Sequence, residues 1–113
     1  LNDVADELRP LKERVAKMVD LYAEAVEKVK ASSNQAEHDF LARRLYNMTG
    51  DIIMSLLILT DATKAPELFA KSAQVYVRAA EEEVVGHAAY VMAFNDDDLK
   101  NFVDEETNDE AEA

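Results

Sequence analysis

The sequence predicts an all-α protein, an up-down-up antiparallel three-helix bundle with a disordered acidic C-terminal tail. Apolar residues recur at spacings of three and four over three long segments, which is the pattern of helices that bury one face. The chain has only two glycines, two prolines and no tryptophan, and this composition favours helix over sheet. The breaks between the segments are short, so consecutive helices are expected to be antiparallel neighbours.

Length and charge restrict the possible partners. The 113 residues are enough for one domain. The formal net charge is −12. From Asn95 onward the chain has nine acidic residues and one lysine, so most of the excess negative charge lies in the tail. Such a chain would be repelled by nucleic acid and by anionic membranes, and we expect neither as a partner. The absence of cysteine excludes disulfides and thiolate metal sites, and it fits a cytoplasmic location.

The first helix is expected over residues 3–31, with Pro10 either marking its true first turn or kinking it. Ser32-Ser33-Asn34 breaks the pattern, and Glu37 follows Asn34 in capping-box register. A second helix is then predicted over residues 35–62, the most apolar part of the chain. Its stripe is Leu41, Leu45, Met48, Ile52, Leu56 and Leu59, widened by Tyr46, Ile53 and Leu57.

The third helix is predicted over residues 66–94, with Pro66 well placed at its start. Its apolar stripe consists of Phe69, Ala73, Tyr76, Val77, Ala80, Val84, His87, Val91 and Phe94. Residues 1–103 are therefore expected to form the bundle domain, with Leu99, Phe102 and Val103 packing back as a short turn. Residues 104–113 are expected to be a disordered acidic tail.

Folding the chain about its two turns predicts which side chains meet. The small residues Ala16, Gly50, Ala79 and Ala80 would lie at one level. Asp51 would lie beside Arg78, and Arg43 and Arg44 would lie near the acidic run 81–83. Small residues would then face small ones and acids would face bases, which supports this topology.

Catalytic and metal-binding patterns are weak. A di-metal bundle needs Glu-x-x-His pairs on separate helices, whereas only Glu83 and His87, four residues apart, approach this pattern. We interpret His87 as a core or boundary residue that hydrogen-bonds to a neighbour, and residues 81–83 as a solvated face. No residue has the base and orienting group that nucleophilic catalysis requires. We assign no catalytic, cofactor-binding or metal-binding residue to this chain.

One candidate interface stands out on the central helix. Phe40, Met54 and Ile58 fall opposite its main stripe, beside Arg43 and Arg44. Two neighbouring helices cannot easily cover that side, so these five residues are predicted to pack against another domain or another chain.

The middle and third helices carry a family resemblance. Tyr46 is followed by Gly50 and by the apolar run 52–59, and after a short turn comes a helix with Phe69 and Tyr76. This arrangement, over about residues 41–84, resembles the extra C-terminal helical domain of bacterial acyl-CoA dehydrogenases. The Leu-Pro ending that is typical of the family's helix is missing, and an acidic tail follows instead.

The resemblance implies a parent flavoprotein of fatty-acid metabolism that binds FAD and oxidises acyl-CoA thioesters. Its catalytic glutamate and flavin-binding residues would lie in preceding domains. The chain itself would then be a non-catalytic accessory domain that packs on those domains or at a dimer interface, and a start at Leu1 suits a piece of a longer protein.

Two alternatives stay open at this point. The chain could be a free-standing interaction module that docks a partner helix without enzymatic activity, through the same Phe40, Met54 and Ile58. It could also be a metal-binding or ligand-binding bundle that uses Glu83 and His87.

Overall fold

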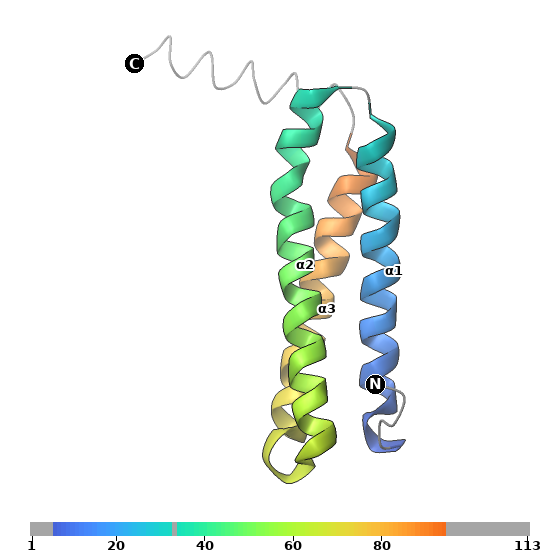
Figure 1. Ribbon diagram of the computed structural model, residues 1–113. Coiled ribbons are helices and arrows are strands. Elements are labelled where there is room, and N and C mark those ends of the chain that lie inside the picture. Colours follow the sequence, from blue (N-terminus) through green and yellow to red (C-terminus); the bar gives the residue numbers. More distant parts are fainter. Residues whose placement is uncertain (1–5, 33, 95–113) are drawn as a thin grey trace, which may run out of the picture.

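Three long helices run side by side in the computed structural model, which describes residues 6–32 and 34–94 (Figure 1). A single turn of 3-10 helix, η1 (Asp6–Leu8), leads into α1 (Arg9–Ala31), and α2 (Gln35–Lys64) and α3 (Pro66–Ala93) follow. The direction of the chain reverses at each connection, so α1 and α3 are parallel and α2 is antiparallel to both. The predicted all-α three-helix bundle is confirmed.

The helix starts follow from local chemistry. Asn34 caps α2, because its side-chain oxygen accepts hydrogen bonds from the backbone N–H groups of Ala36, at 2.9 Å, and Glu37, at 3.3 Å. Pro10 lies in the first turn of α1, which selects the first of its two interpretations. Pro66 likewise opens α3.

The helix ends differ slightly from those predicted. The second helix continues to Lys64 and leaves Ala65 as the only residue between α2 and α3. The Thr63 hydroxyl donates to the Leu59 carbonyl oxygen at 2.8 Å, a bond within the helix that is compatible with this extension. Residues 3–5 of the predicted first helix, Leu99, Phe102, Val103 and the tail 104–113 lie outside the described residues.

The core is a narrow column of apolar side chains between the three helices. On α3, buried alanines alternate with buried valines, and the small residues let the neighbouring helices approach closely. The buried apolar residues are Leu8, Leu11, Val15, Met18, Ala25, Val29, Leu41, Met48, Ile52, Leu59, Ala62, Ala73, Val77, Ala80, Val84, Ala88, Val91 and Phe94. On α3 they match the predicted stripe closely, with Tyr76 and His87 half-buried at the boundary.

The rotation of α2 about its own axis differs from the prediction. Phe40 and Ile58, expected on the open side, pack partly buried against the core. Tyr46, Ile53 and Leu57, expected to widen the core stripe, are 83%, 50% and 55% exposed. The wide face of α2 therefore turns toward Phe40 and Ile58, because α3 covers that flank.

The predicted layer of small residues does not form. Ala80 is buried, whereas Ala16, Gly50 and Ala79 are exposed. A Cβ atom added to Gly50 would meet no other atom within 4 Å. Close packing inside this domain therefore does not require a glycine at position 50.

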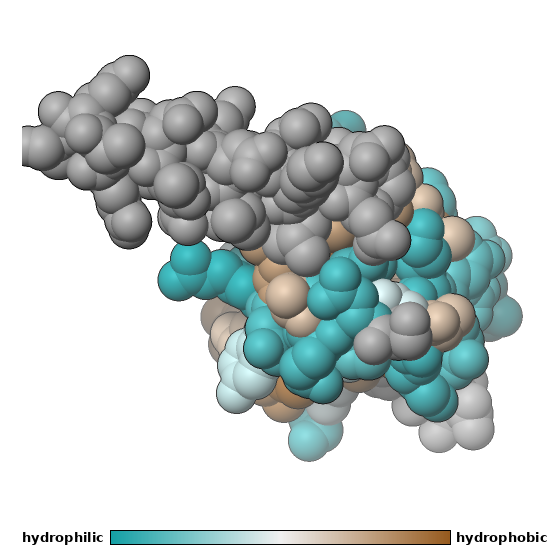
Figure 2. Space-filling view, turned by 90° about the horizontal axis from the view of Figure 1, so that it is seen from above, coloured by the Kyte–Doolittle hydropathy of each residue, from teal (hydrophilic) through white to brown (hydrophobic). Residues whose placement is uncertain are grey.

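The surface is mostly polar at the end where α1 connects to α2. Seen from that end, hydrophilic residues cover most of the surface that the described residues form, with a few hydrophobic patches between them (Figure 2). Within residues 6–32 and 34–94, no helix combines the length and the apolar character that crossing a membrane requires.

Candidate functional site

Arg44 of α2 is half-buried and contacts two side chains of α3. Its guanidinium carbon lies 3.6 Å from the centre of the Tyr90 ring, a cation–π contact. Its Nη1 lies 3.3 Å from His87 Nδ1. A guanidinium can only donate, so a hydrogen bond here requires His87 Nδ1 to accept. The prediction that His87 is a boundary residue bonded to a neighbour agrees with this geometry.

Aromatic side chains continue this contact toward the end of α3. The ring centroids of Phe40 and Phe94 are 5.2 Å apart, and those of Tyr90 and Phe94 are 5.9 Å apart. Both distances lie in the range of favourable tilted aromatic pairs. Phe40 therefore contributes to packing between α2 and α3.

Asp51 and Glu83 bring two carboxyl groups together further along the same helix pair. Burial, a hydrogen bond with Glu83 and the charge of Glu83 together raise the pKa of Asp51 from 3.8 to about 6. Asp51 Oδ2 is buried and has no hydrogen-bond partner. Burial, followed by the charges of Asp51 and Glu83, also raises the pKa of Tyr76. The predicted pairing of Asp51 with Arg78 is therefore wrong, and Asp51 faces another acid.

These contacts form what we call the α2–α3 seam: Arg44, Asp51, Tyr76, Glu83, His87 and Tyr90. An open groove lies over it and is also lined by Tyr46, Asn47, Gly50 and Met54. Within it, the raised pKa lets Asp51 gain or lose a proton near pH 6. Among the described residues, no three His, Asp or Glu side chains gather where they could bind a metal ion.

The three glutamates of the acidic run 81–83 lie in different environments. Glu81 forms an ion pair with Arg14 of α1, at 2.9 Å between Oε1 and Nη1. Glu83 faces Asp51, and Glu82 is exposed. The expectation that Arg44 would meet this run is wrong, because Arg44 contacts His87 and Tyr90, one to two turns further along α3.

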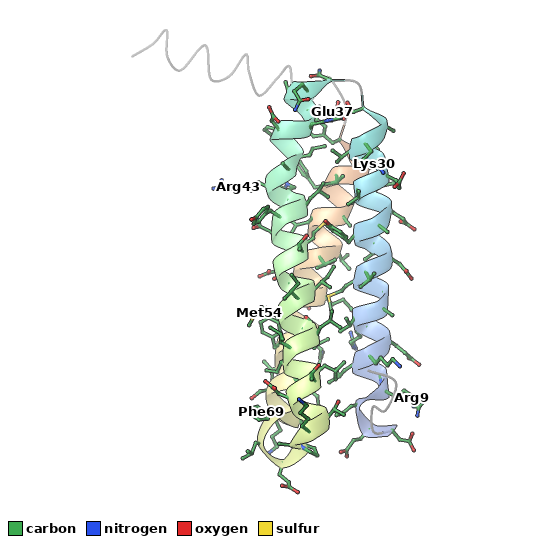
Figure 3. All side chains as sticks on the ribbon, in the orientation of Figure 1. Arg9, Lys30, Glu37, Arg43, Met54 and Phe69 are labelled. Carbon is green, nitrogen blue, oxygen red and sulfur yellow. The ribbon has the colours of Figure 1, made fainter. Side chains whose placement is uncertain are left out.

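The outer face of α2 carries a continuous exposed row of residues, which we call the α2 stripe. Arg43 and Met54, both on this row, project from the side of α2 that faces away from α1 (Figure 3). Beside the row, an apolar groove of about 500 Å³ opens between α1 and α2, where Tyr22 and Leu45 lie next to Gly50 and Ile53. The α2 stripe consists of Asp39, Arg43, Tyr46, Gly50, Ile53, Met54, Leu57, Asp61 and Lys64.

The comparison with known proteins agrees with the resemblance seen in the sequence. The model of a family described as "Acyl-CoA dehydrogenase C terminal" matches residues 1–99. This chain belongs to that family. This chain is similar to the crystal structure of an acyl-CoA dehydrogenase family protein from Porphyromonas gingivalis, with 35% sequence identity and a TM-score of 0.74. The match covers 81% of this chain and 78% of that chain. No curated protein matches significantly.

The five predicted interface residues of this acyl-CoA dehydrogenase C-terminal domain separate into two groups. Arg43 and Met54 lie exposed on the α2 stripe. Phe40, Arg44 and Ile58 are half-buried and contribute to contacts within the domain. The role of these residues in an interface stays a prediction.

Sequence reasoning missed the exposed side chains of Tyr46, Ile53 and Leu57. A signal for them was present, because they share a helix face with charged residues at both ends of α2. Tyr46 and Gly50, the residues that led to the family resemblance, lie on this exposed face of the acyl-CoA dehydrogenase C-terminal domain and not in its core.

Neither of these two grooves suits FAD, the cofactor that the family implies. The apolar groove beside the α2 stripe is lined by no cationic side chain to bind a pyrophosphate. The groove over the α2–α3 seam carries Asp51 and Glu83, whose negative charges would repel it.

Proposed function

We propose that this chain is a non-catalytic accessory domain of an FAD-dependent acyl-CoA dehydrogenase. It acts by packing on the preceding catalytic domains of the same chain or on a second subunit. The parent enzyme, an oxidoreductase, supplies both the flavin and the catalytic residues from its preceding domains.

One observation carries the proposal: the centre of the α2 stripe is apolar and exposed. Tyr46, Ile53, Met54 and Leu57 lie along about three turns of one helix, and all are at least half exposed. A contiguous apolar patch of this kind on a small domain is typical of a surface that is covered in the complete protein. The apolar groove beside Tyr22 and Leu45 extends this surface toward α1.

Local sequence supports the same assignment. A glycine inside a helix lowers helix stability by about 1 kcal/mol relative to alanine. Nothing within this domain approaches Gly50 closely enough to require it. A glycine at the centre of an exposed apolar row suits close approach by a helix or loop from outside the domain.

The experiment compares the parent enzyme with a truncated form that ends before this domain. We expect the truncated enzyme to lose subunit assembly or thermal stability, measured by sedimentation velocity and by the midpoint of unfolding. The isolated domain, mixed with FAD and acyl-CoA, is expected to produce no enoyl-CoA. Activity of the isolated domain, or a truncated enzyme with unchanged assembly and stability, would contradict the proposal.

A matched pair of variants tests the surface in the full-length enzyme. Ile53→Asp combined with Leu57→Asp places two charges on the α2 stripe, and we expect it to reproduce the effect of truncation. Val75→Asp places a charge on an even more exposed apolar side chain, on α3, and we expect no such effect. Equal effects of both changes would contradict the assignment to α2.

A further inference from the structure

The α2 stripe has an order of residue types that points to its partner. Its centre is apolar and small, with Tyr46, Gly50, Ile53 and Leu57. Two opposite charges lie beyond each end of this centre. In chain order they are Asp39 and Arg43 before it, and Asp61 and Lys64 after it.

We propose that the α2 stripe pairs with the α2 stripe of a second copy of this chain, antiparallel and about a two-fold axis. This inference rests on the proposed function and names the partner of that surface. In an isologous contact each pair of facing residues occurs twice. An arrangement centred between Gly50 and Ile53 places Tyr46 against the partner's Leu57, and Gly50 against the partner's Ile53.

The charges support this register. With the same centre, Arg43 lies opposite the partner's Asp61, and Asp39 lies opposite the partner's Lys64. The two-fold axis repeats both pairs, so four opposite-charge contacts flank the apolar centre. Like charges on facing helices oppose pairing, and opposite charges favour it and fix the register.

The parallel arrangement lacks this complementarity. Parallel helices related by a two-fold axis bring each residue next to its own copy. Arg43 would then face the partner's Arg43, and Asp61 would face the partner's Asp61. The order of charges along α2 therefore selects the antiparallel arrangement.

Gly50 has a role in this arrangement that it lacks within one copy. An added Cβ atom at this position meets nothing within 4 Å in the domain, although an interior glycine weakens a helix. Next to the two-fold axis, the absence of a side chain makes room for the partner's Ile53. The backbones can then approach closely at the centre of the contact.

The chain contains no cysteine, so introduced cysteines report the register directly. Arg43→Cys and Asp61→Cys are prepared separately, and each is oxidised alone and mixed with the other. In the antiparallel arrangement, two copies of either position lie roughly 25 Å apart along the axis, too far for a disulfide. We expect a cross-linked dimer in the mixture and little with either variant alone.

The control mixes Arg43→Cys with Glu82→Cys, an exposed position on α3. No cross-link is expected there. Equal cross-linking in the control, or cross-linking of Arg43→Cys with itself, would overturn the proposal. Sedimentation equilibrium that shows only monomer up to millimolar concentration would overturn it as well.

A charge exchange provides a second readout. Arg43→Glu places like charges opposite each other at two positions of the dimer, and we expect dimer affinity to fall about five- to tenfold at low salt. Adding Asp61→Arg to the same chain restores opposite charges, and we expect affinity to recover. Failure to recover would exclude this register.

These results are separable from the proposed function. If the truncated parent enzyme loses assembly while cross-linking and charge exchange fail, the domain packs on the catalytic domains and the self-pairing proposal is wrong. If truncation has no effect while the cross-link forms in the predicted register, the self-pairing proposal stands without the accessory role.

Discussion

Asp51 of α2 and Glu83 of α3 hold two carboxyl groups together across the α2–α3 seam. Asp51 Oδ2 is buried without a hydrogen-bond partner, and the charge of Glu83 opposes ionisation of Asp51. Burial and the neighbouring charge raise the pKa of Asp51 to about 6. In the folded domain Asp51 therefore loses its proton near pH 6, whereas in the unfolded chain it loses that proton near pH 4.

This relationship predicts how stability depends on pH. The pKa of Asp51 is raised on folding, so its stabilising contribution is complete below about pH 4 and is lost as the pH rises through 6. Asp51→Asn removes the charge, and we expect it to raise the free energy of unfolding at pH 7 by about 1–2 kcal/mol, allowing for solvent screening. The gain should shrink toward pH 4, which urea unfolding at both pH values measures.

The control for this experiment is Asp20→Asn, since Asp20 is exposed on α1. It should change stability little and equally at both pH values. A gain for Asp51→Asn that is the same at pH 4 and pH 7 would show that the ionisation of Asp51 does not affect stability.

Glu81 and Glu82 allow a test of the ion pair between α1 and α3. Glu81 is largely buried beside Arg14, with side chains 15% and 41% exposed, whereas Glu82 is exposed. Glu81→Gln should lower the free energy of unfolding by about 0.5–1 kcal/mol, and Glu82→Gln should have almost no effect. A double-mutant cycle with Arg14→Gln measures the coupling, which should weaken in high salt. A coupling energy of zero at low salt would show that the ion pair between Glu81 and Arg14 does not stabilise the domain.

Much of the fold followed from the sequence because helix length, helix starts and turns are local properties. Asn34 and Pro66 fixed two boundaries through capping and backbone geometry. The predicted alignment of α2 and α3 along the bundle axis was also nearly right. Asp51 meets Glu83 and Arg44 meets His87, within one to two turns of the predicted neighbours.

The rotation of α2 could not be predicted from its apolar pattern. Apolar residues occur on every side of this helix, so spacing alone does not distinguish the flank of Phe40 and Ile58 from that of Ile53 and Leu57. Packing against α3 decides between them, and this is a tertiary effect. For the same reason, Arg43 and Arg44, adjacent in sequence, were predicted together but lie in different environments.

Truncation of Met48, at the buried centre of α2, is expected to lower stability much more than truncation of an exposed methionine. Met48 is fully buried, whereas Met92 of α3 is 47% exposed. Met48→Ala should lower the free energy of unfolding by about 2–4 kcal/mol, because it leaves a cavity between the helices. Met92→Ala should cost less than about 1 kcal/mol. Similar losses in guanidinium unfolding would contradict the packing described for α2.

Arg44 is predicted to stabilise the domain and to take no part in pairing between copies. Arg44→Ala removes the contact with the Tyr90 ring and leaves His87 Nδ1 without its donor, so we expect a loss of about 1–2 kcal/mol in the free energy of unfolding. Arg44→Lys keeps the charge without the planar guanidinium and should lose an intermediate amount. Arg78→Ala, at an exposed arginine of α3, is the control and should change stability little.

Arg44→Ala should leave cross-linking between positions 43 and 61 unchanged, because its side chain lies in the α2–α3 seam and not on the α2 stripe. Loss of cross-linking without loss of stability would place Arg44 at the contact between copies.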